Sequence, residues 1–590
     1  MALAFLVFSI ILLIIYFGFT NILTKRWAFW RYTFFSLVLL VLATSFLTDI
    51  WTGIILYGLI LFFSASTFPF LFKKNKGKQP VYGRFVLAET GFATGFCAFM
   101  LSLQTLLLWF LPNELVITIS SLIQFIYLLM PLSYIIYYLI DHDLLNSDYF
   151  VAIYQSTWNG VKNFAKTAFS LKGYMAIIMS IVIIIGGLYC LNGLLEVKLP
   201  QATQQIIAML VLCIVSFFNM KAAFKKSIFY IIVVESLVYL KGLKEWQKYK
   251  TKNPATAYLD GEKTAKEQNY VLVIGESQSR DHLSAYGYAR QTTPWLNEKK
   301  QDDDFILFKN AYSCHVMTAY VMAKVLTESN QYNQKPFGES FSLLNIAKLA
   351  SFKTYYISNQ DELNAVANPA TLIAKDADVL IMTSDSSNAA NSYDMRLAEE
   401  LDKLKAEPGN KLIIIHLYGN HFEYKDRYPE EFNIFNGQRD ECTVNAKNPE
   451  KLCQYDNSIV YTDHVLKELH KIAVNKFNVD AFVYFSDHSD AVERNKKHVS
   501  GQFGFDMARI PLWMYFSKEY QARNSEKLAI LRESKNKYIT NDLMYDTMLG
   551  IMGITTDRYA SKQDLSSEDY AFTKESLLTL NGKISLSEDI

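Results

Sequence analysis

Long apolar runs fill about the first 240 residues of this chain, and they restrict its fold more than any other feature. Spanning the hydrocarbon core of a bilayer takes about 20 mostly apolar residues. The runs cover residues 3–23, 34–47, 51–72, 85–110, 116–140, 175–195 and 206–218, with a shorter one at 229–240. They predict an α-helical transmembrane domain over residues 1–225, with about seven spans and eight as the alternative. The first run lacks a basic start and a cleavage site, so we expect it to be a retained helix.

The basic residues between these runs set the expected topology. Lys73, Lys74, Lys76, Lys78 and Arg84 crowd one loop, which the positive-inside rule assigns to the cytoplasm. Eight spans then carry the C-terminal half to the opposite face. In the alternative, seven spans cross the membrane and residues 229–240 lie on its outer surface as an amphipathic helix. The C-terminal half is then also extracytoplasmic if the N-terminus is inside. This count places the basic loop on the side that the positive-inside rule disfavours. Both counts predict an extracytoplasmic C-terminal half.

Residues 226–268 are charged and polar beyond the last apolar run, which predicts a juxtamembrane helix and linker. The net charge of the whole chain is +1, so no basic field indicates a nucleic-acid partner. Residues 269–590 are numerous enough for one further domain.

Apolar strand patterns alternate with helical patterns in this second domain. The expected strands are 271–274, 354–357, 379–382, 412–416, 481–485 and 512–516, and the expected helices are 319–327, 341–349, 393–405, 459–473 and 538–550. Such alternation predicts an α/β domain with a mostly parallel sheet and helices on both faces.

Two of the expected strands end in potential metal ligands. Glu276 follows the strand at 271–274, and Asp487 and His488 follow the strand at 481–485. Ligands bind at the carboxyl ends of strands in open α/β sheets, so these side chains should converge. Carboxylate oxygens and imidazole nitrogens suit Zn²⁺. Each residue alone has an ordinary structural explanation, such as capping a helix or satisfying backbone donors.

A hydroxyl near such a metal would be an activated nucleophile. Thr318 precedes the helix expected at 319–327, where backbone N–H groups suit a phosphate. His421 follows another strand and His498 lies ten residues beyond His488, so both are candidates for a second metal or for binding phosphate oxygens. The arrangement predicts displacement at phosphorus through a covalent phospho-threonine.

Two of the six cysteines differ from the others. Cys442 and Cys453 lie in a polar segment with little to bury them, which favours a local disulfide and an oxidising compartment, with free thiols as the alternative.

These motifs together resemble the phosphoethanolamine transferases of the alkaline phosphatase/sulfatase superfamily. The resemblance covers about residues 271–516 and is carried, in order, by Gly275-Glu-Ser277, Gly287-Tyr-x-Arg-x-Thr-Thr-Pro294, Ser313-Cys-x-x-x-Thr-Ala319, Gly419-Asn-His421, Tyr455-Asp-Asn-x-x-x-Tyr-Thr-Asp463 and Ser486-Asp-His488. It implies a membrane-anchored enzyme of the inner membrane with a periplasmic catalytic domain. Its donor would be phosphatidylethanolamine, and its acceptor lipopolysaccharide or another envelope glycan.

The resemblance also implies roles for individual residues. Glu276, Thr318, Asp487 and His488 would hold one tightly bound zinc ion, with Thr318 as the nucleophile. His421 and His498 would match residues that bind the donor phosphate or a second zinc. Cys442 and Cys453 match a disulfide loop of the family. Ser156, in the stretch 153–159, stands where relatives often carry a threonine thought to help hold the donor headgroup.

Two departures from the family pattern bear on the acceptor. Lys324 stands where many lipid A-modifying members have a cysteine, and Ser489 replaces a glycine. They favour the lipopolysaccharide core or a periplasmic glucan over lipid A. A metal-dependent phosphodiesterase of the same superfamily stays an alternative. A sulfatase is disfavoured because residues 313–319 lack the required Pro and Arg, and a non-catalytic membrane protein would need the ligand positions to coincide by chance.

Overall fold

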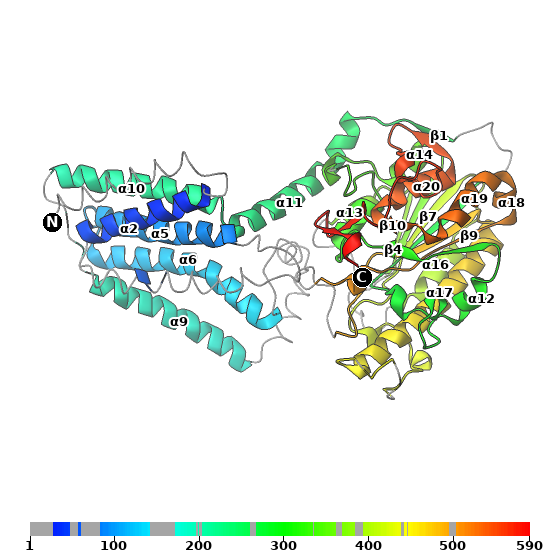
Figure 1. The fold of residues 1–590 in the computed structure, drawn as a ribbon, viewed down its shortest axis with the longest axis horizontal. Coiled ribbons are helices and arrows are strands. Elements are labelled where there is room, and N and C mark those ends of the chain that lie inside the picture. Colours follow the sequence, from blue (N-terminus) through cyan, green and yellow to red (C-terminus); the bar gives the residue numbers. More distant parts are fainter. Residues whose placement is uncertain are drawn as a thin grey trace. The chain divides into compact units, whose positions relative to one another are not determined.

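The computed structural model divides the 590-residue chain into two compact units, Met1–Val238 and Tyr239–Ile590. Figure 1 shows their helices and strands. The structure describes residues 28–47, 57–58, 60, 83–141, 171–195, 197, 199, 203–259, 267–333, 335–360, 368–383, 393–437, 440, 442–444, 446–494 and 503–589. Ser156 and His498 therefore lie outside the described residues, as do most of the apolar runs at 3–23 and 51–72.

The first unit is helical. Its helices are α2 (Ala28–Leu47), α5 (Gly83–Leu107), α6 (Asn113–Asp141), α9 (Leu171–Leu194) and α10 (Thr203–Phe224). Among the described residues, three stretches are long and apolar enough to cross a membrane, and they are Ala88–Leu107, Asn113–Ile135 and Gln205–Phe224. Shorter apolar helices cover Phe34–Thr44 and Ile178–Leu194. The total of seven or eight spans stays a prediction.

Buried amide side chains join three of these helices. Asn192 of α9 accepts a hydrogen bond from Gln104 of α5 at 2.5 Å and donates one to Gln124 of α6 at 2.8 Å. Asn192 also donates to Ser121 of α6 at 3.0 Å. Amides away from water need partners, so these bonds fix the register of α5, α6 and α9.

Helix α11 (Ile228–Lys252) runs through the boundary between the units, and its last part belongs to the second. There Trp246 is fully buried and stacks on Phe337 with ring centroids 4.3 Å apart. Lys250 pairs with Asp376 at 2.6 Å. Residues Tyr239–Lys252 are therefore anchored to the second unit. The predicted division at residues 226–268 stays a prediction.

A seven-stranded sheet in the order β3-β9-β8-β2-β7-β5-β6 forms the centre of the second unit. The strands are β2 (Asn269–Gly275), β3 (Phe305–Phe308), β5 (Lys353–Ser358), β6 (Val379–Met382), β7 (Lys411–His416), β8 (Ala481–Ser486) and β9 (Leu512–Phe516). Strands β8, β2, β7, β5 and β6 are parallel, whereas β9 is antiparallel to both β8 and β3. The sheet is thus mixed, with β2 between β7 and β8.

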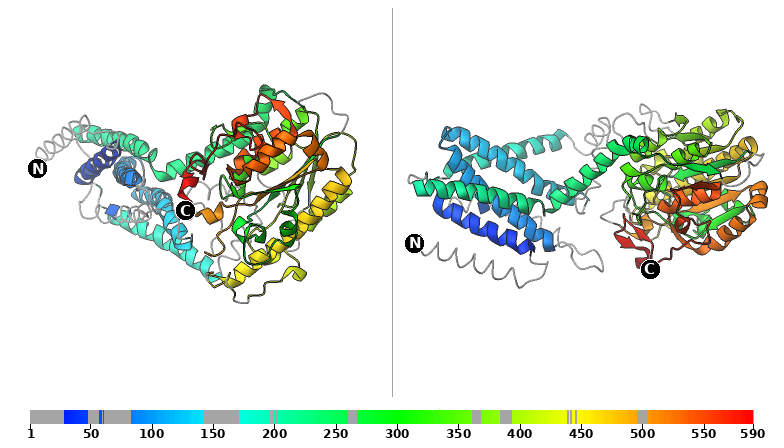
Figure 2. Two further views of the ribbon diagram at one scale, coloured as in Figure 1. Left: turned by 45° about the vertical axis from the view of Figure 1, so that its right-hand side comes forward. Right: turned by 90° about the horizontal axis from the view of Figure 1, so that it is seen from above.

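Helices cover both faces of this sheet (Figures 1 and 2) because alternate residues of each buried strand point to opposite sides. Val271 and Val273 pack with α12 (Pro294–Lys299), α16 (Met395–Lys403) and α17 (Pro449–Phe477). Leu272 and Ile274 pack with α13 (Thr318–Val325), α14 (Leu343–Leu349) and α20 (Met544–Met552). The remaining elements are β1 (Ala257–Leu259), β4 (Asn310–Tyr312), α15 (Pro369–Ala374), α18 (Lys518–Arg523), α19 (Ser525–Glu533), β10 (Tyr538–Thr540), β11 (Ile554–Thr556), β12 (Leu578–Thr579) and β13 (Ile584–Ser585).

All six predicted strands are present, to within two residues at either end. The prediction misses β3, whose four apolar residues could equally belong to a buried helix by pattern alone. It is wrong at the start of the helix expected over 538–550, because Tyr538–Thr540 is strand β10 and pairs with the distant β4. Local periodicity carries no information about such a partner.

The His470 imidazole on α17 predicts how stability depends on pH. Its ring packs among Trp295, Phe305 and Tyr515, and its Nε2 has no hydrogen-bond partner among the described residues. Burial lowers the pKa of His470 to about 4. The unfolded chain binds this proton below about pH 6.5 and the folded chain only below its own pKa, so stability falls as the pH falls between those values.

We expect His470→Phe to reduce this loss of stability, which amounts to about 1.4 kcal/mol per pH unit for one group. Phenylalanine fills the same aromatic site without a titrating nitrogen. Urea unfolding of both proteins at pH 7 and pH 5 measures the difference. Equal acid destabilisation of the variant and the parent protein would show that His470 is not its source.

Candidate functional site

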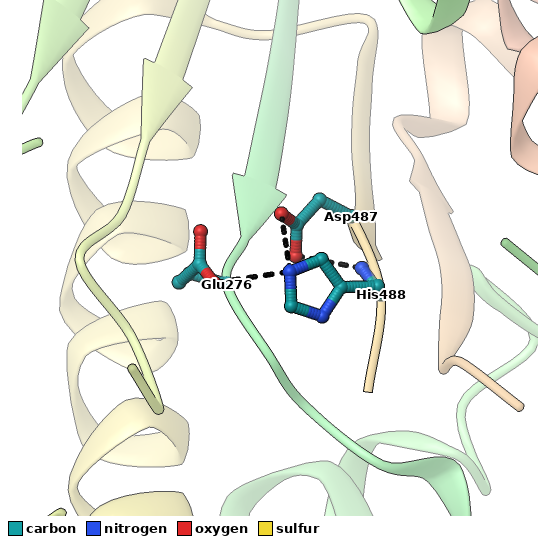
Figure 3. A group of neighbouring side chains, drawn as sticks. All are labelled: Glu276, Asp487 and His488. Carbon is teal, nitrogen blue, oxygen red and sulfur yellow. Dashed lines mark hydrogen bonds and ion pairs between the residues drawn. The ribbon is translucent and has the colours of Figure 1, made fainter. Parts of the chain in front are cut away.

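The parallel pairing of β2 with β8 brings the predicted metal ligands together. Gly275 at the end of β2 lies opposite Ser486 at the end of β8. The residues that follow these two strand ends are Glu276 and Asp487-His488. They therefore meet at the carboxyl edge of the sheet. Figure 3 shows these three side chains directed toward one another. Their ligand atoms all lie within 4.8 Å of one another, and all three side chains are buried.

Four distances of 3.0–3.4 Å connect polar atoms of Glu276, Asp487, His488 and Thr318. His488 Nε2 lies 3.4 Å from Glu276 Oε1 and 3.4 Å from Asp487 Oδ2. Thr318 Oγ1 donates a hydrogen bond to Glu276 Oε2 at 3.0 Å and lies 3.3 Å from His488 Nε2. Thr318 is the first residue of α13, and Met317 caps this helix with extended backbone. The structure thus places the predicted nucleophile at the predicted ligands.

Hydrogen bonds with the backbone orient two of the predicted ligands, Asp487 and His488. Asp487 Oδ1 accepts from Ser277 N at 3.0 Å and from His488 N at 2.6 Å, which directs Oδ2 toward the imidazole. Burial raises the pKa of Asp487 to about 6, because these hydrogen bonds only partly offset the loss of water. His488 Nδ1 lies 3.3 Å from the Ser489 carbonyl. A proton on Nδ1 would donate to that carbonyl and leave the Nε2 lone pair facing the carboxylates.

The donor set fits a zinc ion. Zinc binds carboxylate oxygen and imidazole nitrogen at about 2.0–2.2 Å with tetrahedral geometry, which gives ligand–ligand distances of about 3.3–3.6 Å. The 3.4 Å separations fall in this range. Asp487 Oδ2 is also buried without a hydrogen-bond partner among the described residues, which an anionic oxygen tolerates poorly unless a cation neutralises it. Three protein ligands with an adjacent hydroxyl are typical of a catalytic zinc site.

A close approach between two loops holds Glu276 in place. Gly419 adopts a left-handed conformation with φ of 51°, and a Cβ there would lie 2.9 Å from the Glu276 carbonyl oxygen. The next residue, Asn420, donates its N–H to the same oxygen at 2.9 Å. Glycine is needed because no other residue allows both the backbone conformation and the contact.

The structure places the other predicted site residues differently. His421 comes directly after Gly419 and Asn420. Its ring packs on Tyr418 and Phe422, with centroids 5.2 and 4.9 Å away. It is not part of the three-residue cluster found among the described His, Cys, Asp and Glu side chains. Its role stays a prediction, and so do those of Ser156 and His498.

The predicted disulfide is absent from the structure, in which Cys442 and Cys453 are both free thiols. The premise was wrong for Cys453, which lies in the first turns of α17 and is buried rather than exposed in a polar loop. Its Sγ accepts a hydrogen bond from Arg290 at 3.4 Å. The segment looks polar because residues such as Glu450 are exposed, whereas Cys453 lies with Leu452 and Tyr455 on the buried side of the helix start.

Two polar residues near the predicted metal ligands were not among the predicted site residues. Gln360 Nε2 donates to the Leu417 carbonyl at 2.6 Å and lies 3.4 Å from Glu276 Oε2. Asp394 accepts the N–H groups of Tyr418 and Gly419 at 2.9 and 2.7 Å and so supports the loop against Glu276. The position of Gln360 just after a predicted strand is a usable signal. Nothing local marks Asp394.

Comparison with known proteins gives consistent relatives for the second unit. The sulfatase family profile matches residues 268–554. Phosphoethanolamine transferase EptC of Escherichia coli K12 is 32% identical over 317 residues, which are 52% of this chain and 54% of that protein. Phosphoethanolamine transferase CptA of Salmonella typhimurium is 28% identical over 51% of this chain and 54% of that protein. The chain thus spans about half the length of the curated relatives it matches.

Solved structures agree with these relatives. The zinc complex of the C-terminal periplasmic domain of EptC from Escherichia coli is 27% identical, with a TM-score of 0.52, and covers 57% of this chain and 97% of that domain. The integral membrane protein lipooligosaccharide phosphoethanolamine transferase A from Neisseria meningitidis is 18% identical, with a TM-score of 0.56. It covers 86% of this chain and 97% of its own, and this likeness concerns the fold.

Proposed function

We propose that this protein is a zinc-dependent phosphoethanolamine transferase, because residues 268–554 match the sulfatase family profile and the second unit resembles the zinc-bound periplasmic domain of EptC. It moves phosphoethanolamine from phosphatidylethanolamine to lipopolysaccharide. The names of its curated relatives support the transferred group. The apolar helices of the first unit support a place in the inner membrane, with residues 269–590 as the periplasmic catalytic domain.

One observation carries the proposal: the Thr318 hydroxyl lies 3.0 Å from Glu276 and 3.3 Å from His488 at the start of α13. Glu276, Asp487 and His488 would hold the zinc ion, with Thr318 in the fourth position. When bound, zinc lowers the pKa of a coordinated hydroxyl and offsets negative charge on the phosphate. The N–H groups at the start of α13 are donors for the phosphate oxygens.

The residues of the chain divide the transfer into two displacements. Glu276 orients the Thr318 hydroxyl, whose oxygen attacks the phosphorus of the donor. The Oγ1–P bond forms as the P–O bond to the glycerol breaks, and diacylglycerol leaves with the proton. An acceptor hydroxyl or protonated phosphate oxygen then attacks the phosphorus of the threonine-linked phosphoethanolamine. The new O–P bond forms as the Oγ1–P bond breaks, and the proton of the acceptor restores the Thr318 hydroxyl. His421 and His498 would bind the donor phosphate or a second zinc, and Ser156 would help to hold the headgroup.

The acceptor is tested with the purified full-length chain in detergent, with zinc and a phosphatidylethanolamine that carries a fluorescent acyl chain. Release of fluorescent diacylglycerol reports the first displacement. Parallel reactions contain lipopolysaccharide, isolated lipid A, a periplasmic glucan or water alone, and mass spectrometry locates the added phosphoethanolamine. We expect modification of the lipopolysaccharide core. Labelled glucan would identify the alternative acceptor, and free phosphoethanolamine with every acceptor would identify a phosphodiesterase.

A further inference from the structure

Two distant hydroxyls hold the turn at residues 277–279, which follows Glu276: Ser486 Oγ accepts the Gln278 N–H at 2.9 Å, and Tyr455 binds the residues on either side. Tyr455 lies on α17, is fully buried, and is far in sequence from the residues it binds. Its hydroxyl donates to the Ser277 carbonyl at 2.6 Å and accepts from Ser279 N–H at 2.8 Å. We propose that Tyr455 is a positioning residue that sets the geometry of the metal site through the turn at residues 277–279. This inference rests on the zinc site of the proposed function.

Ser277 is the link between Tyr455 and the ligands. Its N–H donates to Asp487 Oδ1 at 3.0 Å, and its hydroxyl donates to Glu276 Oε1 at 2.7 Å. One residue therefore orients carboxylates from two different strand ends. A rotation of the Ser277 backbone would move both donors at once.

The backbone of Ser277 is strained. Its φ is 56°, in the left-handed region that residues with a side chain adopt at a cost. Such a conformation persists when its surroundings impose it. Asp487 and Ser486 accept the N–H groups of Ser277 and Gln278. Tyr455 constrains the turn from both sides, because its hydroxyl binds the carbonyl of Ser277 and the N–H two residues later.

Removal of the hydroxyl would leave the Ser277 carbonyl and the Ser279 N–H without that partner, and both residues are buried. Relaxation of Ser277 toward the right-handed region would then restore their hydrogen bonding by other routes. The Ser277 N–H would turn away from Asp487, and the two carboxylates would no longer share one orientation. Loss of a group that is hydrogen-bonded to a metal ligand weakens metal binding by about 10- to 100-fold in other proteins, and Ser277 is such a group here.

A purely structural role for Tyr455 predicts a different result. The ring also packs against Tyr424 and His282, with centroids 4.9 and 5.3 Å away. Phenylalanine keeps this packing. If Tyr455 only fills the core and satisfies two backbone groups, its hydroxyl contributes to stability and not to zinc affinity.

The test compares Tyr455→Phe with Tyr461→Phe. Tyr461 is buried on the same helix, and its hydroxyl accepts a backbone N–H from Met395 at 3.2 Å, which is neither a metal ligand nor part of the turn at 277–279. Zinc affinity of the metal-free, full-length proteins in detergent is measured by competition with a chromogenic chelator. Thermal unfolding without metal measures stability.

We expect Tyr455→Phe to weaken zinc binding 10- to 100-fold and Tyr461→Phe to change it less than twofold, while the unfolding midpoints of the two variants fall similarly. The visible spectrum of bound Co²⁺ should change in Tyr455→Phe and not in Tyr461→Phe. Equal zinc affinity and equal spectra in the two variants would overturn the positioning role. Failure of the unaltered protein to bind zinc would overturn the zinc site itself, and the inference with it.

Discussion

Thr318→Val should lower the release of diacylglycerol from phosphatidylethanolamine by at least about 10³-fold, which corresponds to about 4 kcal/mol of transition-state stabilisation. Valine has the shape of threonine and is also β-branched, so α13 should form as before. What it lacks is the oxygen that lies 3.0 Å from Glu276 and 3.3 Å from His488. Without this oxygen no covalent phospho-enzyme can form.

The measurement is fluorescent diacylglycerol release, together with mass spectrometry of the peptide that contains residue 318. Thr318→Ser serves as the matched control, because it keeps a hydroxyl while losing a methyl group. We expect serine to retain measurable transfer and a phosphorylated peptide. Diacylglycerol release by the valine variant at the rate of the unaltered protein would exclude Thr318 as the nucleophile.

Asp487→Asn should separate zinc binding from stability. The substitution replaces one of the two carboxylate ligands by a neutral amide. We therefore expect zinc binding to fall by at least about 10³-fold and transfer to be lost. The metal-free protein should be no less stable than its parent. Burial raises the pKa of Asp487, so its charge is costly, and the asparagine oxygen can still accept the N–H groups of Ser277 and His488.

Unfolding with and without zinc measures this effect. Zinc at 100 times its dissociation constant should stabilise the unaltered protein by about 2.7 kcal/mol and the variant not at all. Asp463→Asn is the matched control, because Asp463 is also buried, accepts the N–H groups of Trp295 and Leu296, and has a pKa raised to about 7. Zinc-dependent stabilisation should persist in this control. Its persistence in Asp487→Asn would mean that Asp487 is not a ligand.

The cluster of candidate metal ligands could be predicted from the sequence because its signal is local. Glu276 and Asp487 each end a continuous apolar run, and such a run is typical of a buried parallel strand. The carboxyl ends of parallel strands lie at the same edge of a sheet, so a common edge could be expected for both segments before β2 and β8 were known to be neighbours. The pairing of the two strands places those ligands side by side.

The polar residues around the ligands depend on contacts that no local pattern records. Tyr455 begins one of the motifs that carry the resemblance, but it precedes the helix expected at 459–473. No local pattern shows that its hydroxyl meets the turn at 277–279, because that contact depends on where α17 packs. The prediction for Cys453 was wrong for a related reason. The polar residues before it suggested an exposed loop, although the thiol is buried on a helix. Burial on a helix depends on which face meets the core, and that is a property of packing.

The sequence by itself determined the apolar N-terminal half, the alternation of strands and helices, and the residue types at the strand ends, because hydrophobic periodicity and strand termination are properties of consecutive residues. The tertiary structure alone decided the mixed strand order, the left-handed conformation of Ser277 and the 3.4 Å spacing of the ligands. These features arise between segments far apart in the chain, where hydrogen bonds and close packing, rather than local preference, select the geometry.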